Sequence, residues 1–439
     1  MATLTKSRLR ASAGVSLVAA LALTGCSASP AEDSDNDQDH EDHTSEEQGA
    51  EETQGPQSRL VMTYDGGVMV IDAASLETVA ELEIDGFNRI NVAGDGRHVL
   101  VSTQGGWQVL DAGTWTEPHG DHTHSYAVEP ALTDLLIEAD TPAHVVNHDG
   151  NTILFDDGTG DVTVLHSDDW GEAIDHGHVH TVREYRAPEA HHGVAVTVGD
   201  DMLFVTTGNE DGRDGAVLLD ANDEVVAESD QCPGIHGETT VGDNVVAGCE
   251  DGVLILHGDH FHKIDAPDDF GRIGNAFSVD GSEIVLGDYK NDPEAGNELS
   301  DIALIDTEAE SMQIVDTEST YTWRGLARGM DASALVLGTD GSLRVFDEES
   351  GELTATIPVI EAWTAPEEWQ SAHPAIAEHD GFVYVTDPET QTIHVVDYAS
   401  GEVVRSGELP HAPNELVVST AELPEAGAHD HDEEGDHDH

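Results

Sequence analysis

A short apolar run that ends in Asp or His recurs along most of the chain, and this repeat restricts the possible folds more than any other feature of the sequence. Each run is followed by a turn of small or acidic residues. Eight such segments occur, and they read VMVIDAASLETV, WQVLDAGTW, VTVLHSDDW, AVLLDANDEVV, VLILHGDHF, IALIDTEAESM, LRVFDEESGEL and IHVVDYASGEV. A buried strand, a tight turn and a second strand are typical of the hairpin between the third and fourth strands of a propeller blade. Because hardly any helical pattern lies between these segments, the repeat predicts an all-β fold.

The number of residues between successive first strands is typical of propeller blades. Their separations range from 39 to 54 residues, and they begin near Ile90, His144, His192, His236, Asn275, Arg324 and His373. One further unit, residues 60–82, has only three strands, and residues 411–418 read as the strand that it lacks. Pairing these two ends closes the ring and covers its exposed edges. We therefore predict a β-propeller of eight blades at residues 59–420, with seven blades as the alternative if residues 236–265 share strands with a neighbour.

Four of the expected first strands begin with histidine, and these residues are His144, His192, His236 and His373. Equivalent positions of radially arranged blades approach one axis. The imidazoles can therefore meet although the sequence separates them. A lone histidine at a strand start is more often a turn or hydrogen-bonding residue, and this is the alternative interpretation.

Two histidine-rich segments precede the His144 and His192 strands. Residues 119–124 read HGDHTH, and residues 176–180 contain three histidines, His176, His178 and His180. We expect both segments on the face where the first strands begin, because the connections between blades lie there. Zinc prefers imidazole and carboxylate in a four-ligand site. The candidate ligands on this face are His122, His144, His192 and His236, with Asp121 as a possible substitute.

The N-terminal segment predicts export and lipidation. Three basic residues precede an apolar run at residues 11–23, which is too short for a membrane span. The sequence LTGC at residues 23–26 resembles a bacterial lipobox, in which the cysteine is lipidated. We expect residues 1–25 to be a lipoprotein signal peptide and Cys26 to anchor the mature chain to the outer face of the cell membrane. Plain secretion is the alternative.

Both ends of the mature chain are acidic and poor in apolar residues, so neither can bury enough surface to fold. Residues 26–58 form a predicted disordered tether, and residues 421–439 form a predicted disordered tail. Alternating His and Asp in the tail are ligands that capture zinc loosely, whereas a merely solvated acidic tail is the alternative. The candidate capture residues of the two ends are His40, His43, His429, His431, His437 and His439.

The charge of the chain limits its partners. It has 90 acidic and 16 basic residues, a balance that excludes nucleic acid as a partner and electrostatic adhesion to anionic lipid. Such a field attracts cations. Dispersed surface acids are also a general solubility device, so a salt-rich habitat explains the charge equally well, but it does not explain the 26 histidines.

Two cysteines remain beside Cys26. Cys232 and Cys249 are most simply one disulfide in an oxidising compartment, and it closes a loop worth roughly 3 kcal/mol in the chain-entropy model. The competing interpretation makes Cys232 a thiolate ligand that acts with His236 in a Cys-x-x-x-His pair.

Several segments together resemble the AztD-type zinc metallochaperones of bacterial zinc-import systems. They are the export signal, the HGDH loop, AHVVNHDG, HHGVAV, CPGIHGE and GCEDGVL. The resemblance covers residues 59–420 and is strongest at residues 119–252. It implies a β-propeller that binds zinc on one face and passes it to the solute-binding protein of a zinc ABC importer. It also implies zinc ligands among His119, Asp121, His122, His144, His191, His192 and His236.

These observations together predict a monomeric zinc metallochaperone with Zn²⁺ as its metal and no catalytic turnover. The lipobox departs from a soluble member of the family and indicates a membrane-tethered donor. A metal-dependent propeller enzyme is one alternative, although the sequence contains no nucleophile elbow and no Ser/His/Asp order in a catalytic context. A propeller that serves only as an interaction scaffold is the other.

Overall fold

The structure is a computed structural model, and it describes residues 49–120, 122–199 and 201–422. The predicted signal peptide, Cys26, most of the tether and nearly all of the tail lie outside these residues. Within the described ranges, no helix is both long enough and apolar enough to span a membrane.

The described residues form nine antiparallel sheets, eight with four strands and one with three. In each four-stranded sheet the strands run in order from the first strand outward. The sheets in the first half of the chain are β5 (Ile90–Val92), β6 (His98–Thr103), β7 (Gly106–Asp111) and β10 (Ala131–Glu138); β11 (Pro142–His148), β12 (Asn151–Asp156), β13 (Asp161–His166) and β14 (Arg183–Arg186); β15 (Ala195–Val198), β16 (Met202–Asn209), β17 (Gly212–Leu219) and β18 (Val225–Ser229); and β19 (His236–Val241), β20 (Asn244–Cys249), β21 (Gly252–His257) and β22 (His260–Asp265).

The second half of the chain continues the same pattern. Its sheets are β23 (Ala276–Phe277), β24 (Ile284–Tyr289), β25 (Leu299–Asp306) and β26 (Ser311–Tyr321); β27 (Leu326–Arg328), β28 (Ala334–Leu337), β29 (Ser342–Phe346) and β30 (Leu353–Pro358); β31 (Ile376–His379), β32 (Phe382–Asp387), β33 (Thr392–Asp397) and β34 (Glu402–Glu408); and β35 (Leu416–Ser419), β2 (Arg59–Tyr64), β3 (Gly67–Asp72) and β4 (Thr78–Glu83).

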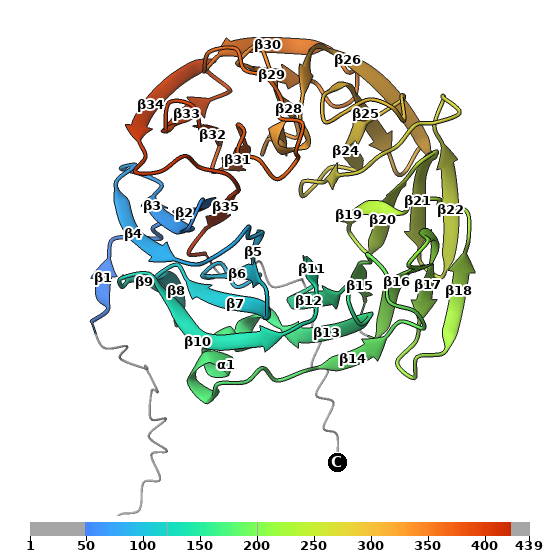
Figure 1. Cartoon of the computed structure of the whole chain (residues 1–439), viewed down its shortest axis with the longest axis horizontal. Coiled ribbons are helices and arrows are strands. Elements are labelled where there is room, and N and C mark those ends of the chain that lie inside the picture. Colours follow the sequence, from blue (N-terminus) through green and yellow to red (C-terminus); the bar gives the residue numbers. More distant parts are fainter. Residues whose placement is uncertain (1–48, 121, 200, 423–439) are drawn as a thin grey trace, which may run out of the picture. The chain divides into compact units, whose positions relative to one another are not determined.

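The sheets are arranged in a ring, as Figure 1 shows. First strands of successive sheets contact one another, for example β5 with β11, β11 with β15 and β31 with β35. The ring closes through the predicted pairing of the two ends, because β35 pairs with β2 from Arg59 opposite Ser419 to Met62 opposite Leu416. The predicted all-β propeller fold is therefore confirmed. The number of eight blades stays a prediction, because a ninth sheet is present.

The core lies between neighbouring sheets. The second and third strands of a sheet are continuous apolar runs, such as LVM in β2 and VMVI in β3, and they are buried. Such runs suit strands that are covered on both faces. The outer strand β4 alternates exposed and half-buried residues, as expected at the rim. Val196 and Phe204 of one sheet, for example, share a buried cluster with Val245 and Leu254 of the next.

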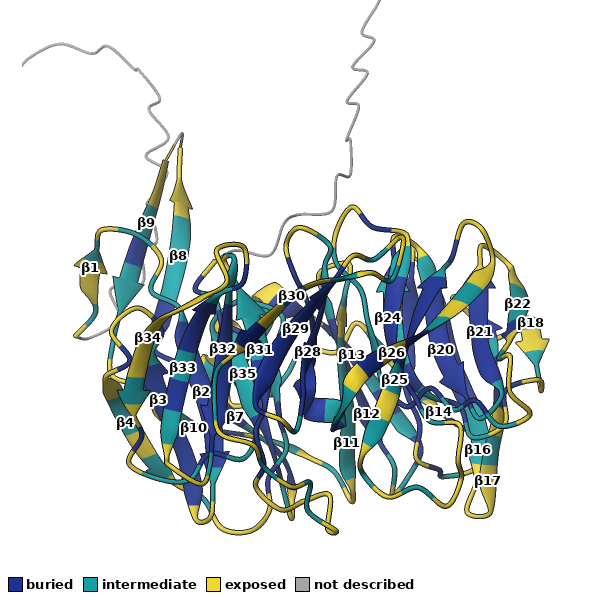
Figure 2. Cartoon of the chain, turned by 90° about the horizontal axis from the view of Figure 1, so that it is seen from above, coloured by how far each residue is buried: buried dark blue, intermediate teal, exposed yellow. Residues whose placement is uncertain are grey.

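Two insertions interrupt the regular pattern. A hairpin of β8 (Thr114–His119) and β9 (His122–Ala127) stands between β7 and β10, and β1 (Glu51–Thr53) adds to β9 as the third strand of the ninth sheet. Figure 2 shows this hairpin extending beyond the ends of the blade strands. The segment WQVLDAGTW was expected to turn directly into a fourth strand. That expectation is wrong, because the fourth strand is β10.

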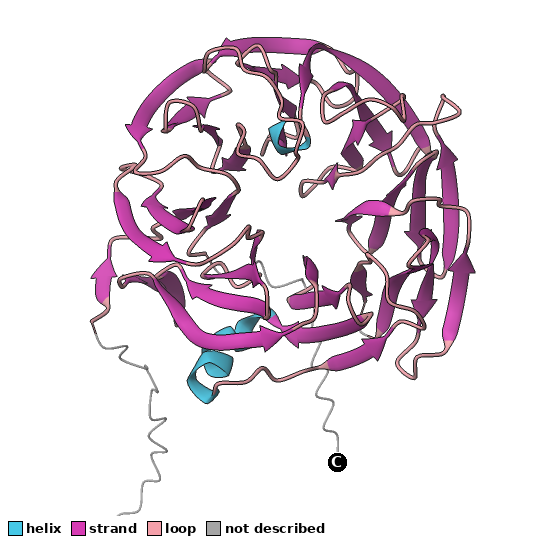
Figure 3. Ribbon diagram, viewed as in Figure 1, coloured by secondary structure: helices cyan, strands magenta, loops and turns pink. Residues whose placement is uncertain are grey.

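The second insertion is helical and follows β13. It consists of a 3-10 turn, η1 (Ser167–Asp169), and the helix α1 (Trp170–His176), which lie before the fourth strand β14. Figure 3 shows α1 among the strands, together with the short 3-10 turn η2 (Trp323–Gly325). Trp170 is buried and its Nε1 donates to the carbonyl oxygen of Ala93 at 2.9 Å. The segment VTVLHSDDW therefore also departs from the expected hairpin.

Candidate metal centres

Three histidines from three successive sheets meet at the starts of their first strands. His144 lies in β11, His236 begins β19, and His192 lies three residues before β15. Their ring centroids are 5.0 to 5.1 Å apart, and the facing ring nitrogens lie within 4.8 Å of one another. The Nε2 atoms of His192 and His236 are 3.0 Å apart. We call His144, His192 and His236 the strand-start cluster.

Each imidazole of the strand-start cluster is oriented through its other nitrogen. Nδ1 of His144 lies 3.3 Å from Oε1 of Glu238, and Nδ1 of His192 lies 2.5 Å from Oδ2 of Asp157. Nδ1 of His236 donates to the carbonyl oxygen of Gly274 at 2.6 Å. An Nδ1–H that donates to oxygen leaves the Nε2 lone pair available to a metal, and such partners fix the ring of a ligating histidine.

Local irregularities in the strands direct two of these side chains. The register of β11 against β12 shifts between Pro142 and Val145, so His144 lies in a bulge. The register of β19 shifts between His236 and Glu238, and the residue between them, Gly237, has a φ of 66°. A Cβ at this glycine would lie 2.6 Å from the backbone of Gly274. Glycine is thus required for the bulge that places His236 beside the Gly274 carbonyl.

The charges of the strand-start cluster suit metal binding. Burial lowers the pKa of His236 to about 3, and the charge of His144 adds to this effect. Burial also acts to lower the pKa of His144, but the carboxylate of Glu238 outweighs it, and the net shift is upward. Burial acts to raise the pKa of Glu238, whereas His144 more than offsets it and lowers that pKa. Near neutral pH, His236 is therefore a neutral ligand and Glu238 a carboxylate.

Two other histidines at strand starts lie outside this cluster. His191 is buried, with Nδ1 2.9 Å from the carbonyl oxygen of Glu189 and Nε2 3.1 Å from that of Thr206. His373 is also buried, stacks on Trp363, and has its Nδ1 2.8 Å from the carbonyl oxygen of Ser371. Both residues therefore hydrogen-bond to nearby backbone carbonyl oxygens. This is the alternative role that the sequence analysis gave to a histidine at a strand start.

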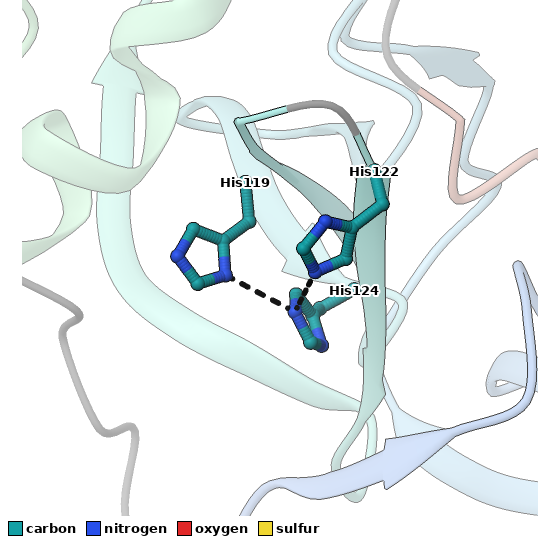
Figure 4. A group of neighbouring side chains, drawn as sticks. All are labelled: His119, His122 and His124. Atoms are coloured by element: carbon teal, nitrogen blue, oxygen red, sulfur yellow. Dashed lines mark hydrogen bonds between the residues drawn. The ribbon is translucent and has the colours of Figure 1, made fainter.

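A second group of histidines lies at the tip of the β8–β9 hairpin. Nε2 of His124 is 3.2 Å from Nδ1 of His119 and 3.0 Å from Nε2 of His122, and the three rings point toward one another in Figure 4. His119 is paired with His122 across the hairpin, and His124 follows on the same face of β9 as His122. We call His119, His122 and His124 the hairpin cluster. Asp121 lies outside the described residues.

The two clusters do not share a face. The hairpin leaves its sheet at the end of β10 where Ala131 pairs with Asp111. The chain enters β11 from the opposite end of β10, where Glu138 pairs with Gly106. The eight residues of β10 separate these ends, a distance of roughly 25 Å. The expectation that the HGDHTH loop joins His144 is therefore wrong. It failed because the loop is inserted within a blade and does not connect two blades.

The histidines of the other histidine-rich segment, His176, His178 and His180, also lie outside the connection where they were expected. They follow β13 and precede β14 of the same sheet, so they are not part of the connection into the His192 strand. His176 and His178 stack at 5.9 Å and are exposed.

Three side chains of these clusters were not named as ligands or partners from the sequence. His124 was visible in the HGDHTH motif, and its spacing of two from His122 was the available signal. Glu238 and Asp157 had no comparable signal. The structure joins Cys232 and Cys249 in a disulfide, and both residues are buried in the core. The capture residues predicted in the tether and the tail lie outside the described residues.

No protein-family model matches the chain. Zinc chaperone AztD of Citrobacter koseri is 25% identical over 385 residues, which cover 84% of this chain and 87% of that protein. The chain is similar to AztD. A crystal structure of Citrobacter koseri AztD matches with a TM-score of 0.71 at 23% identity, covering 83% of this chain and 98% of that one. The structure of apo AztD gives a TM-score of 0.70 with the same coverage. The resemblance expected from the sequence motifs is confirmed, and the two proteins share a fold.

Proposed function

We propose that this chain is a zinc chaperone that holds Zn²⁺ at the strand-start cluster and donates it to another protein. The main support is the orientation of His144, His192 and His236. Their Nδ1 atoms all face oxygen, which leaves their Nε2 atoms available to a metal. The similarity to AztD, which is named a zinc chaperone, supports the same function. A chaperone delivers metal without turnover, so we propose that the chain is not an enzyme.

The geometry of the strand-start cluster fits zinc. Four ligands in a tetrahedron, with Zn–N bonds of about 2.1 Å, place imidazole nitrogens about 3.4 Å apart. The 3.0 Å between the Nε2 atoms of His192 and His236 is close to this value. The three imidazoles would fill three of the four ligand positions of a tetrahedral zinc ion. The fourth is left for water or for a ligand of an acceptor protein.

Unequal exposure within the cluster favours transfer by ligand exchange. The side chain of His192 is 45% exposed, whereas that of His144 is 20% exposed. An acceptor can therefore approach from the side of His192, occupy the open position and displace this histidine before the metal is released to solvent. Asp157 holds His192 through Nδ1, so the ring returns to the same position after transfer.

We propose the solute-binding protein of a zinc ABC importer as the acceptor. The lipobox supports a location on the outer face of the cell membrane, where Cys26 anchors the chain near such an importer. The acidic, histidine-rich tether and tail then gather zinc loosely around the propeller. The disulfide between Cys232 and Cys249 suits the oxidising compartment of this location.

Transfer kinetics test the proposal. Zinc-loaded protein is mixed with the apo solute-binding protein, and the rate of zinc movement is compared with the rate of release into excess chelator. We expect transfer to be faster than release and to rise with acceptor concentration. Transfer at the release rate, whatever the acceptor concentration, would identify a passive zinc store. Turnover of model ester or phosphoester substrates by the zinc-loaded protein would instead identify an enzyme.

A further inference from the structure

An arginine lies at the start of β5, on the same face of the ring as the strand-start cluster. Arg89 directly precedes Ile90, the first residue of β5, and β5 contacts β11, which carries His144. Figure 1 shows both strands facing the centre of the ring. The positive charge of Arg89 acts to lower the pKa of His144. Arg89 is therefore an electrostatic neighbour of the proposed zinc centre.

Two tryptophans and a buried carboxylate hold the guanidinium of Arg89. Its central carbon lies 5.1 Å from the centre of the Trp323 ring and 5.7 Å from that of the Trp369 ring. Nε of Arg89 lies 2.6 Å from Oε1 of Glu415. These three partners precede β27, β31 and β35, so three other blades contribute to the contact. A guanidinium held at Nε and beside aromatic rings is oriented before a ligand arrives.

The outer edge of the Arg89 guanidinium is accessible. The side chain is 42% exposed although its Nε is buried, and its terminal nitrogens form no hydrogen bond within the described residues. Arg97 shows what such an edge can bind, because its Nε and Nη2 lie 2.8 and 2.6 Å from the two carboxylate oxygens of Asp111. Paired N–H groups in this planar arrangement match a carboxylate.

The charges of the group that holds Arg89 do not balance. Glu415 also accepts a hydrogen bond from Nη2 of Arg324 at 3.2 Å, so two guanidinium groups share one carboxylate. Burial lowers the pKa of Arg324 to about 10, and this arginine is still charged near neutral pH. The three groups thus carry one excess positive charge. Beside a zinc site this charge opposes the metal, unless an anion from another molecule joins it.

Exposed aromatic rings lie beside Arg89. Trp369 is 41% exposed and Phe87 is 38% exposed, and their rings meet edge to face at 5.5 Å. An arginine among exposed aromatic side chains is typical of the residues that contribute most to protein–protein binding. A small free anion would leave these rings in water, whereas a protein would cover them. The surface therefore suits an acidic side chain that a protein carries.

We propose that Arg89 binds a carboxylate side chain of the acceptor protein beside the strand-start cluster, and that bound zinc strengthens this contact. The inference rests on the proposed function, because it takes the strand-start cluster as the place from which zinc is donated. A carboxylate at Arg89 offsets the positive charge near the metal, so the carboxylate and zinc favour each other's binding. An acceptor then binds the loaded chain more tightly than the empty one and leaves more readily once zinc has moved.

Titration of the full chain with N-acetylglutamate amide, which presents one glutamate side chain without backbone charges, tests the site. Tryptophan fluorescence at constant ionic strength follows binding, because Trp323 and Trp369 adjoin Arg89. The neutral N-acetylglutamine amide is the control ligand. We expect only the carboxylate to bind, and zinc loading should tighten its binding at least about threefold. Equal responses to the two ligands, or no effect of zinc, would overturn the proposal.

Variants assign the carboxylate to Arg89. Arg89→Gln should weaken its binding at least about tenfold, with and without zinc, because charge and paired donors are both lost. Arg405→Gln is the matched control, since Arg405 lies on β34 and donates to the carbonyl oxygen of Ala73. Trp369→Ala removes only an exposed ring and should weaken binding about threefold. If zinc-loaded Arg89→Gln binds the carboxylate as tightly as the unchanged protein, the ligand binds the metal itself and the assignment is wrong.

Transfer kinetics test whether the carboxylate belongs to the acceptor. With the apo solute-binding protein, Arg89→Gln should raise the acceptor concentration for half-maximal transfer about fivefold. Its own zinc affinity should not fall, because the change removes a positive charge near the metal, whereas damage to the fold would lower it. An unchanged dependence on acceptor concentration would overturn the assignment to the acceptor. If even the unchanged protein transfers zinc no faster than it releases it, the proposed function fails, while the titrations still decide whether Arg89 binds carboxylate.

Discussion

Nε2 of His192 lies 3.0 Å from Nε2 of His236, although 44 residues separate them. The two residues lie at the starts of the first strands of successive sheets. The propeller ring therefore creates the strand-start cluster, because the sheets that begin with β11, β15 and β19 each place the start of their first strand beside the other two.

Removing one imidazole of the strand-start cluster should weaken zinc binding strongly. We expect His144→Ala, His192→Ala and His236→Ala each to lower zinc affinity by at least about tenfold, because each loses a ligand of the metal. Competition titration with a zinc chromophore measures this. His394→Ala is the control, since His394 contacts Thr392 and Ser406 on a distant blade. An unchanged affinity in all three variants would place the tight site elsewhere.

Gly237 should be sensitive to substitution in both stability and zinc binding. Gly237→Ala introduces a Cβ at a φ of 66° and 2.6 Å from the Gly274 backbone. Gly242→Ala is the matched control, because its φ is 53° but nothing lies within 4 Å of the added Cβ. The control should cost about 1 kcal/mol through backbone strain alone. Gly237→Ala should cost more than twice as much in urea unfolding and should also weaken zinc binding. Equal costs would show that the approach of Gly274 is unimportant.

His373 should make the stability of the propeller depend on pH. Burial, with the nearby charge of Arg324, lowers the pKa of His373 to about 4, whereas an unfolded chain has a histidine pKa near 6.5. Between these values only the unfolded state binds the proton. The free energy of unfolding is therefore highest above pH 6.5, where His373 is neutral in both states. As the pH falls toward 4, protonation of this histidine in the unfolded state lowers the free energy of unfolding by about 3 kcal/mol at most.

Urea unfolding in chelator at pH 7, 5.5 and 4.5 measures this dependence. His373→Gln should flatten the loss of stability over this range, even if the variant is less stable at pH 7. A variant with the same slope as the unchanged protein would assign the pH dependence to other groups.

The tail should be dispensable for tight binding. Deletion of the residues beyond Leu423 is expected to remove weak zinc sites and leave the tight site intact, because a tail with the disorder that its sequence predicts would lose conformational freedom on coordinating metal. Zinc titration before and after the deletion measures both classes of site. Loss of the tightest site would overturn the assignment of zinc to the propeller.

The sequence predicted the strand-start cluster because the blade repeat sets a register. Once His144, His192 and His236 are aligned as strand starts, the ring brings them together. The sequence did not show which of His191 and His192 is the metal ligand, because the repeat does not determine which of two neighbouring side chains faces the other two histidines. It also missed the partnership of Glu238 with His144, which depends on the bulge at Gly237.

The position of the hairpin cluster was not predictable from the repeat. An apolar run that ends in Asp111 looks the same whether the next element is a fourth strand or an insertion. The insertion places His119 and His122 at the other end of the blade. Long-range pairing of β1 with β9 also brings Oε1 of Glu52 to 2.7 Å from Nδ1 of His124, and no local pattern marks that contact.

An anomalous difference map at the zinc absorption edge, from crystals of the zinc-loaded protein, tests whether zinc binds at the strand-start cluster. We predict a peak about 2.1 Å from the Nε2 atoms of His144, His192 and His236, with a fourth ligand that the propeller does not supply. A zinc-loaded protein without a peak among these three histidines would show that the strand-start cluster is not the zinc site.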